Sequence, residues 1–497
     1  MIRYRIPPGV RAEYLKSRPV LATSSGGRVV VDYQLLQLWE AAEGRDLDEI
    51  LTSFKFVPVP SREVRAALAC LAEAGLLLRE GDIQTNKAHV PVEGELVSAV
   101  IVGYNSREWL ETCLSSLKRQ NYSPIEIILV DNASTDGTLQ WLKENYPGVP
   151  AIHLENPRPL AEAINLGVRR AEGAYFLILN PDVWLEPDAV SQMVAVAGED
   201  PTCAAVAAKL KFSWAPAFLN GLGSFVGAIS WGTDIGLGHL DLGQFDSWRE
   251  VPSACFAGAL IPRPAWEQVG EVDDQFPLYY EDSEWSYRAR LIGWHVSAAP
   301  GAVIYHAFSG RIPSGADRGL GDRKLRQVVY GRLRFASKLL DGVVLWRFLA
   351  GYFIEDFMNG ASALFKGRWR TLGAVLGGWR DYLHTLPALR IERGGFGSRR
   401  RKSAREVFRL QEKVPVPLIW HGLPLLTWDI IRHHYLPLMV AGGLHPLPEF
   451  SGILAEKSSF DRAPVEYLER ARQIWRLEGF GALLHRMWKH VQRRLQV

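Results

Sequence analysis

A chain of 497 residues exceeds what one ordinary hydrophobic core supports, so we expect two to four domains. Apolar residues make up 47% of the chain and charged residues 22%, which excludes an intrinsically disordered protein. Lys and Arg number 57 against 54 Asp and Glu, a balance that gives no general positive field for binding nucleic acid.

The cysteines lie far apart and form no Cys-x-x-Cys pair, at Cys70, Cys113, Cys203 and Cys255. This spacing argues against a zinc site and against a disulfide framework, and it fits a reducing cytoplasm. The sequence has no signal-like N-terminus and no run of about 18 uninterrupted apolar residues. We therefore expect a cytoplasmic protein without a membrane-spanning helix.

Residues 1–92 form the first predicted unit. Hydrophobic spacing predicts a strand, three helices and a returning strand, at residues 28–31, 35–44, 47–54, 61–74 and 76–78. This order in so short a segment is typical of a winged-helix module. The third helix carries only Arg62 and Arg65 as basic residues, which makes DNA binding the weaker interpretation.

The second predicted unit, residues 97–325, alternates continuous apolar strands with amphipathic helices. Strands are expected at residues 97–102, 125–130, 151–154, 174–179 and 302–305, and helices at 109–120, 139–145 and 159–171. This alternation predicts the α/β class, with a mostly parallel sheet covered by helices on both faces. Ligands of such sheets bind beyond the carboxyl ends of the strands, so the polar residues that follow the strands are the candidates.

Polar turns follow the first two strands of this unit. Tyr104 and Asn105 follow the first strand, and Asp131 ends the second. A carboxylate at the end of a buried strand can hydrogen-bond a base or a ribose. A turn that caps the next helix at Ser134 or Asp136 explains the same residues equally well.

Carboxylates and a histidine follow later in the unit. Asn180 and Asp182 flank a proline after a strand, where oxygen ligands suit a hard divalent cation, although a simple turn is the alternative. Glu281 and Asp282 begin a predicted helix and favour its dipole, and the flanking aromatic residues would raise the pKa of Asp282 toward that of a general base. His306 is either a metal ligand or a structural partner.

In combination these motifs resemble glycosyltransferase family 2, whose members have the GT-A fold of nucleotide-diphospho-sugar transferases. The resemblance covers about residues 98–309 and rests on the segments VIVGYNS, VDNASTDGT, LNPD, CFAGAL, YYEDSEWSYR and YHAFSG. It is strongest toward the rhamnosyl- and mannosyltransferase-like branch, in which NPD replaces the more usual DxD. Asn180 thus stands where many relatives carry an Asp.

The resemblance implies a role for each candidate residue. Asp131 would contact the nucleoside base, and Asp182 with His306 would hold Mg²⁺ or Mn²⁺. Asp282 would deprotonate the acceptor hydroxyl, while Glu281 would position the acceptor or support the base. The residues implied to line the donor pocket are Tyr104, Asn105, Asn156, Asn165 and Asn180.

The reaction implied by the resemblance is an inverting transfer to an acceptor hydroxyl. The donor would be a nucleotide sugar of the GDP-mannose, dTDP-rhamnose or UDP-glucose type, and the acceptor a lipid-linked glycan, a polysaccharide or a peptide. Two other functions stay open: a nucleotidyltransferase, although residues 103–105 are not a glycine-rich triphosphate loop, and a catalytically weak protein that binds a peptide or a partner.

The flanking units carry expectations of their own. Residues 1–92 resemble PqqD-like winged-helix modules, which favours binding of a peptide, while a packing or dimerisation role is the alternative. Residues 326–497 read as amphipathic helices rich in Trp and Arg, at 328–340, 345–365, 372–386 and from about 465, with a break at 393–402. Such helices fit attachment to an anionic membrane surface at the inner face of the cell membrane, or packing onto the catalytic unit or a second subunit.

Overall fold

The computed structural model describes residues 2–80 in interrupted stretches, residues 90–307 with gaps at 214, 228–232, 238–240 and 242–244, and residues 318–410 except 366. Within these residues, no helix has the length and apolar character needed to cross a bilayer.

The described residues of the N-terminal unit include two small antiparallel sheets and the helices α1 and α2. One sheet joins β2, β3 and β4, and the other pairs β1 with β5. The Trp39 indole donates a hydrogen bond to the carbonyl of Leu76 at 2.8 Å, which ties α1 to the returning strand. Most of the predicted third helix lies outside the described residues, and the strands β1 to β3 were not predicted. The bounds are β1 (Arg3–Arg5), β2 (Arg11–Leu15), β3 (Arg18–Ala22), β4 (Arg28–Val30), α1 (Tyr33–Ala41), α2 (Leu47–Ser53) and β5 (Leu78–Glu80).

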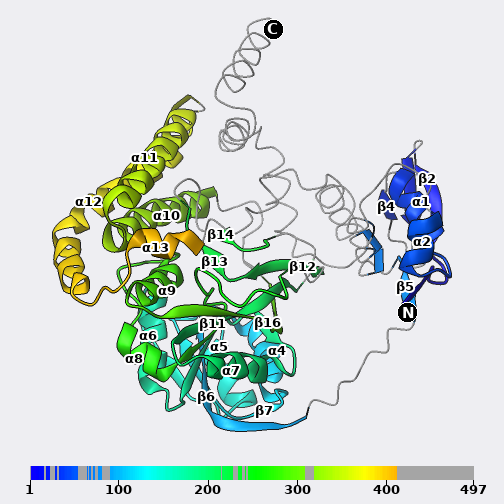
Figure 1. Ribbon diagram of the computed structural model, residues 1–497, viewed down its shortest axis with the longest axis horizontal. Coiled ribbons are helices and arrows are strands. Elements are labelled where there is room, and N and C mark those ends of the chain that lie inside the picture. The colour runs from blue at the N-terminus through cyan, green and yellow to red at the C-terminus, as the bar shows by residue number, and fades with distance from the viewer. Residues whose placement is uncertain are drawn as a thin grey trace, which may run out of the picture.

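A nine-stranded sheet forms the centre of the molecule (Figure 1). Its strand order is β10-β16-β11-β15-β9-β6-β7-β8, with β12 paired to β11. The strands β9, β6, β7 and β8 are mutually parallel, whereas β15 runs antiparallel between β9 and β11. The bounds are β6 (Val92–Gly103), β7 (Tyr122–Asp131), β8 (Ala151–His153), β9 (Tyr175–Leu179), β10 (Val183–Leu185), β11 (Cys203–Phe212), β12 (Ala215–Leu222), β15 (Gly258–Pro262) and β16 (His295–His306).

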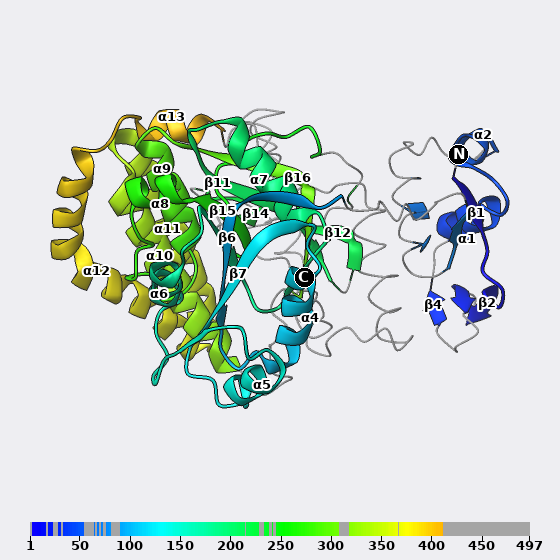
Figure 2. The same cartoon turned by 90° about the horizontal axis from the view of Figure 1, so that it is seen from below.

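The strands alternate their side chains between two hydrophobic cores, as the expectation of helices on both faces requires. In β6, Val100 and Val102 pack into the core that includes α6 and α8, while Ala99 and Ile101 pack into the core with α4 and α7. Figure 2 shows these helices on opposite sides of the sheet. Their bounds are α4 (Arg107–Lys118), α5 (Thr138–Asn145), α6 (Leu160–Arg170), α7 (Ala189–Glu199), α8 (Arg263–Val269) and α9 (Glu281–Leu291).

In the described part of the chain, four helices follow the sheet; two of them, α10 and α13, contact α9, and the other two, α11 and α12, pack against α10 (Figure 1). They are α10 (Arg318–Leu339), α11 (Gly342–Phe365), α12 (Trp369–Gly397) and α13 (Ala404–Phe408). Val329, Leu333 and Phe335 of α10 are buried in the same core as α6 and α8. The first part of the predicted helical region therefore packs onto the unit that contains the sheet.

The predicted break at residues 393–402 begins too early. The helix α12 continues to Gly397 because Phe396 is buried and Arg393 donates to the carbonyl of Ser337 at 2.6 Å. The arginine run that follows is held against the rest of the chain, since Arg400 pairs with Asp341 at 2.7 Å and the Arg401 amide donates to Leu291 at 2.8 Å. The segments predicted beyond residue 410 lie outside the described residues.

Candidate active site

Asp131 is fully buried at the carboxyl end of β7. Its Oδ2 contacts His153 Nδ1 at 2.8 Å and accepts a hydrogen bond from the Ser134 amide at 3.3 Å. Its Oδ1 is buried without a hydrogen-bond partner among the described residues. A buried carboxylate oxygen without a donor is costly, and an N–H or O–H group of a bound molecule would remove that cost.

The turns after β6 and β7 are bonded to each other. The Asn105 amide donates to Ser134 Oγ at 2.7 Å, and Asn105 Oδ1 accepts from the Thr135 amide at 2.7 Å. Asn105 adopts a left-handed conformation with φ of 48°, which Asn tolerates better than most residues. The ring of Tyr104 is exposed beside this turn. Capping explains Asp136, which accepts from the Thr138 amide at 3.1 Å, but it leaves the burial of Asp131 unexplained.

Asn156 and Asn165, which were expected to line the donor pocket, differ in their surroundings. Asn156 is exposed in the loop after β8. Asn165 is buried on α6, where its Nδ2 donates to the Val272 carbonyl at 2.8 Å and its Oδ1 accepts from the Val272 amide at 3.0 Å. Asn165 therefore braces the chain at residue 272 with both polar atoms of its side chain.

Asp182 and His306 meet where β10 pairs with β16. Asp182 Oδ1 lies 3.4 Å from His306 Nε2, and Asn180 Nδ2 lies 3.4 Å from the same nitrogen. His306 is more than 120 positions from Asn180 and Asp182 in the sequence, yet the three residues form one cluster near the carboxyl end of β9. The sequence-based grouping of Asn180, Asp182 and His306 thus corresponds to a real spatial group.

Asn220 of β12 orients the histidine from the other side. Asn220 Oδ1 lies 2.6 Å from His306 Nδ1, while Asn220 Nδ2 donates to Asp234 Oδ2 at 3.1 Å. Asn220 thus bridges Asp234 and the imidazole of His306 through the two polar atoms of its side chain.

Asp182 and His306 can bind a divalent cation only if a bound molecule supplies further oxygen ligands. The described residues contain no group of three or more His, Cys, Asp or Glu side chains that could hold a metal. One carboxylate and one imidazole leave most of the positions of Mg²⁺ or Mn²⁺ to water and to phosphate oxygens. The donor set thus suits a cation that arrives with a diphosphate.

Glu281 and Asp282 begin α9, directly after two residues in an unfavourable backbone conformation. Tyr279 and Tyr280 have φ of 68° and 71°, a region that bulky residues rarely adopt. Strain of this kind persists where packing holds it in place and is concentrated at functional sites. The Ser283 amide donates to Asp282 Oδ1 at 2.6 Å, which fixes the Asp282 carboxylate at the helix start.

Burial shifts the pKa of three carboxyl groups near the start of α9, those of Asp234, Glu281 and Asp282, which we call the acid cluster. It raises the pKa of Glu281 to about 8, with a further contribution from the charge of Asp282. Burial also raises the pKa of Asp282, and burial together with the charge of Asp282 raises the pKa of Asp234 to about 7. Asp282 therefore acts electrostatically on Asp234, whose hydrogen bond to Asn220 leads to His306.

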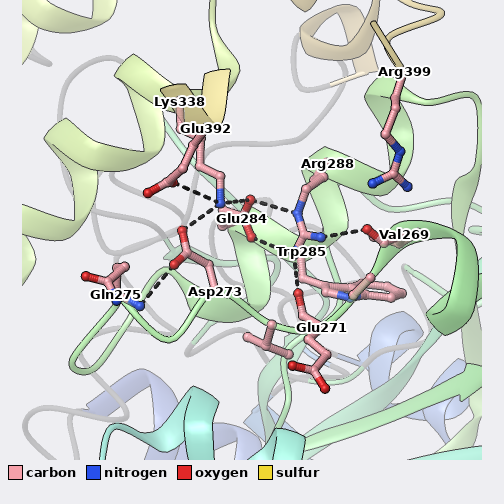
Figure 3. A network of polar contacts seen from close by, with 12 residues as sticks. Val269, Glu271, Asp273, Gln275, Glu284, Trp285, Arg288, Lys338, Glu392 and Arg399 are labelled. Carbon is pink, nitrogen blue, oxygen red and sulfur yellow. Dashed lines mark hydrogen bonds and ion pairs between the residues drawn. The ribbon is translucent and has the colours of Figure 1, made fainter. Parts of the chain in front are cut away.

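The helix α9 is held by a network of buried ions (Figure 3). Arg288 donates to both oxygens of Glu284, at 2.8 and 3.0 Å, and to the carbonyl of Val269 at 2.7 Å. Lys338 of α10 contacts Glu284 at 3.0 Å and Asp273 at 2.6 Å. The helical region thus fixes the position of the helix that carries Glu281 and Asp282.

Sequence reasoning missed His153, Asn220 and Asp234. His153 ends the third parallel strand opposite Asp131, so the rule that pointed to Asp131 could also have found it. Asn220 and Asp234 stand in β12 and in β14 (Thr233–Asp234), which pairs with β13 (Ser224–Phe225). No motif marks them, because their role depends on contacts with a histidine far along the chain.

Residues 98–262 match the family described as Glycosyl transferase family 2. The chain is 25% identical over 237 residues to an N-acetylglucosaminyl-diphospho-decaprenol L-rhamnosyltransferase of Mycobacterium tuberculosis, a match that covers 43% of this chain and 76% of the relative. It is 34% identical over 113 residues to the putative glycosyltransferase EpsH of Bacillus subtilis, over 22% of this chain and 32% of that relative.

Two solved structures are similar to the chain at low identity. One is the mannosyltransferase PcManGT from Pyrobaculum calidifontis in complex with GDP-Man and Mn²⁺, with 17% identity and a TM-score of 0.38 over 65% of this chain and 97% of that one. The other is S. aureus TarS 1–349 in complex with UDP-GlcNAc, with 17% identity and a TM-score of 0.40 over 63% and 92%. The expected α/β fold is confirmed by the mixed sheet with helices on both faces and by the family match. The chain therefore carries a glycosyltransferase domain of family 2, at residues 98–262.

Proposed function

We propose that this protein transfers a sugar from a nucleotide-diphosphate sugar to an acceptor hydroxyl with inversion at the anomeric carbon. The observation that carries the proposal is the meeting of Asp182 and His306, 3.4 Å apart, where β16 joins the sheet that contains the family 2 match at residues 98–262. This pair suits a cation bound with a diphosphate, and Asp131 is the last residue of a parallel strand of the same sheet.

The donor's nucleoside would bind at the ends of β6 and β7. Asp131 Oδ1 is a buried acceptor that an N–H group of a base can satisfy. Tyr104 and Asn105 form the adjoining turn, and Tyr104 offers an exposed ring. We propose a donor of the GDP-mannose, dTDP-rhamnose or UDP-glucose type.

The diphosphate would lie at the second cluster. Asp182 and His306 would hold Mg²⁺ or Mn²⁺, and Asn180 would stand beside them. When bound, the cation neutralises the charge that develops on the departing nucleoside diphosphate.

The chemistry at the acceptor needs one base. The acceptor oxygen bonds to the anomeric carbon from the face opposite the diphosphate, the carbon–oxygen bond to the diphosphate breaks, and the hydroxyl proton passes to Asp282. Burial raises the pKa of Asp282 and thereby improves it as a proton acceptor. Glu281, whose pKa is raised to about 8, would keep its proton at neutral pH and hold the acceptor through a hydrogen bond.

The acceptor and the flanking units complete the proposal. The relative from Mycobacterium tuberculosis is named for an acceptor linked to decaprenol, which favours a lipid-linked glycan here over a polysaccharide or a peptide. We place the protein in the cytoplasm, attached peripherally to the inner face of the cell membrane through residues 326–497. For residues 1–92 we propose a PqqD-like module that binds a peptide.

Variant Asp282→Asn tests the assignment of the base. We expect the variant to bind nucleoside diphosphate as the wild type does but to lose transfer, because an amide cannot accept the proton. Glu267→Gln, an exposed carboxylate on α8, is the matched control. Near-normal transfer by Asp282→Asn would refute the role of Asp282.

The products of a donor screen separate the other functions. Nucleoside diphosphate is the product expected from a sugar transferase, whereas release of pyrophosphate would indicate a nucleotidyltransferase. Binding of nucleotides without any turnover would indicate a binding protein on this scaffold.

A further inference from the structure

The helix α11 exposes an apolar stripe along its whole length. Phe348 and Tyr352 face inward and are buried, whereas large apolar side chains recur three to eight positions apart on the outer face. Trp346, Phe357 and Phe365 are 70%, 68% and 89% exposed. The stripe continues past the end of α11 to Trp369, at the start of α12. We call these residues, with Val343 and Phe353, the outer face of α11.

The carboxylates of α11 and α12 pair with α10, whereas several arginines of these helices are exposed. All four carboxylates of these helices pair with arginines of α10: Glu355 and Asp356 with Arg332, Asp381 with Arg326, and Glu392 with Arg334. The exposed charged side chains of α11, α12 and their connection are arginines, at Arg347, Arg368, Arg370, Arg380 and Arg390. The outer face of α11 and its connection to α12 therefore expose apolar side chains and arginines, while the two carboxylates of α11, Glu355 and Asp356, are buried.

This combination fits one kind of surface best. Apolar side chains that enter the boundary of a bilayer, with arginines at the level of the headgroups, match an anionic lipid surface. A second copy of the chain fits poorly, because a twofold contact between identical faces would bring their arginines together. Since the described part of the chain has no spanning helix, the contact would be peripheral.

The inner side of α11 connects this face to the acid cluster. Tyr352 donates to the carbonyl of Gly227 at 3.0 Å, and the Arg332 guanidinium lies 4.8 Å from the centre of the Tyr352 ring. On α10, Phe335 packs against the ring of Tyr280, which directly precedes Glu281. The outer face is thus separated from the start of α9 by α11 and α10, each roughly 10 Å across.

We propose that the outer face of α11 docks the protein on an anionic lipid bilayer and that it presents the acid cluster to a membrane-anchored acceptor. The second half of this inference rests on the proposed sugar transfer. The docking itself does not depend on it.

The experiment measures flotation of the full chain with vesicles of phosphatidylcholine, with and without phosphatidylglycerol, in the absence of any donor. We expect Trp346→Glu together with Phe357→Glu to lower the partition coefficient at least tenfold, a change of about 1.4 kcal/mol. Tyr14→Glu, an exposed aromatic residue of β2, is the control and should bind as the wild type does. Arg347→Gln with Arg370→Gln should weaken binding only to the vesicles that contain phosphatidylglycerol.

Several outcomes would overturn the proposal. Failure of the wild type to bind anionic vesicles, or unchanged binding of the double glutamate variant, would show that α11 is not the docking surface. If only the removal of residues 465–497 abolished vesicle binding, the membrane contact would lie in that segment. A wild-type dimer that Trp346→Glu converts to a monomer, without vesicle binding, would make the face a contact between copies. Vesicle binding without any donor turnover would refute the transferase and leave the docking intact.

Discussion

Glu281→Gln tests the buried acid cluster through the pH dependence of folding. The wild-type side chain is 6% exposed, its Oε2 has no hydrogen-bond partner among the described residues, and its pKa is raised from 4.5 to about 8. Between these two pH values the unfolded chain releases the proton while the native protein retains it. The free energy of unfolding contributed by Glu281 is therefore fully present below pH 4.5 and is lost as the pH rises toward 8. Glutamine cannot ionise, so the variant lacks this loss.

The magnitude follows from the difference between the two pKa values. At about 1.4 kcal/mol per pKa unit, we expect Glu281→Gln to be more stable than the wild type by on the order of 3–5 kcal/mol at pH 9. At pH 4 the two proteins should be nearly equal, since glutamine resembles protonated glutamate in shape. Urea unfolding from pH 4 to pH 9 measures the difference, with Glu267→Gln as the control for loss of an exposed charge. A difference that does not change with pH would refute a protonated Glu281 in the native state.

Three further predictions concern the other buried polar groups. Asp131→Asn should weaken nucleotide binding roughly 10- to 100-fold by calorimetry, because it replaces a buried acceptor, and unchanged affinity would argue against a base at this site. Arg332→Met should lower the free energy of unfolding by about 3–5 kcal/mol, because Glu355 and Asp356 lose their buried partner; a loss below about 1 kcal/mol in urea unfolding would contradict this. Asn220→Leu should weaken Mn²⁺ binding roughly 10- to 100-fold by electron paramagnetic resonance, and retained binding would show that the histidine needs no such support.

The sequence predicted the first half of the sheet well. The strands β6, β7, β8 and β9 and the helices between them match the expected ranges within a few residues, except that β6 begins five residues earlier. Continuous apolar strands and a helical period of 3.6 are local signals, and a parallel sheet with two covered faces follows from their alternation. The start of α9 at Glu281 was predicted in the same way, from acidic residues at a helix N-terminus.

Sequence patterns suggested candidate site residues only where those residues follow a strand or begin a helix. Asp182 and His306 meet as the family resemblance implied, but Asn220 and Asp234 reach them through β12 and β14, whose pairing is not visible in a local pattern. Asn165 shows the limit of reasoning from closeness in sequence. It lies on α6 close to the expected donor site in sequence, yet the helix face that carries it turns toward Val272, 107 positions away.

The C-terminal region shows the same limit for surfaces. Trp and Arg at helical spacing predicted amphipathic helices, but not which face each helix buries. Trp379 donates to Asp356 at 2.9 Å and so belongs to the interior, whereas Trp346 is exposed. The glycines at residues 394, 395 and 397 suggested a break, yet tertiary packing of Phe396 outweighs their low helix propensity.

The most direct test of the central claim is the release of nucleoside diphosphate from a panel of nucleotide sugars with Mn²⁺, comparing the wild type with Asp182→Ala. The wild type should release the diphosphate from one of these donors only when the cation is present, and Asp182→Ala should abolish the release while the protein remains folded. Release that is unaffected by Asp182→Ala, or by removal of Mn²⁺ and Mg²⁺, would contradict a cation-assisted transfer at Asp182 and His306.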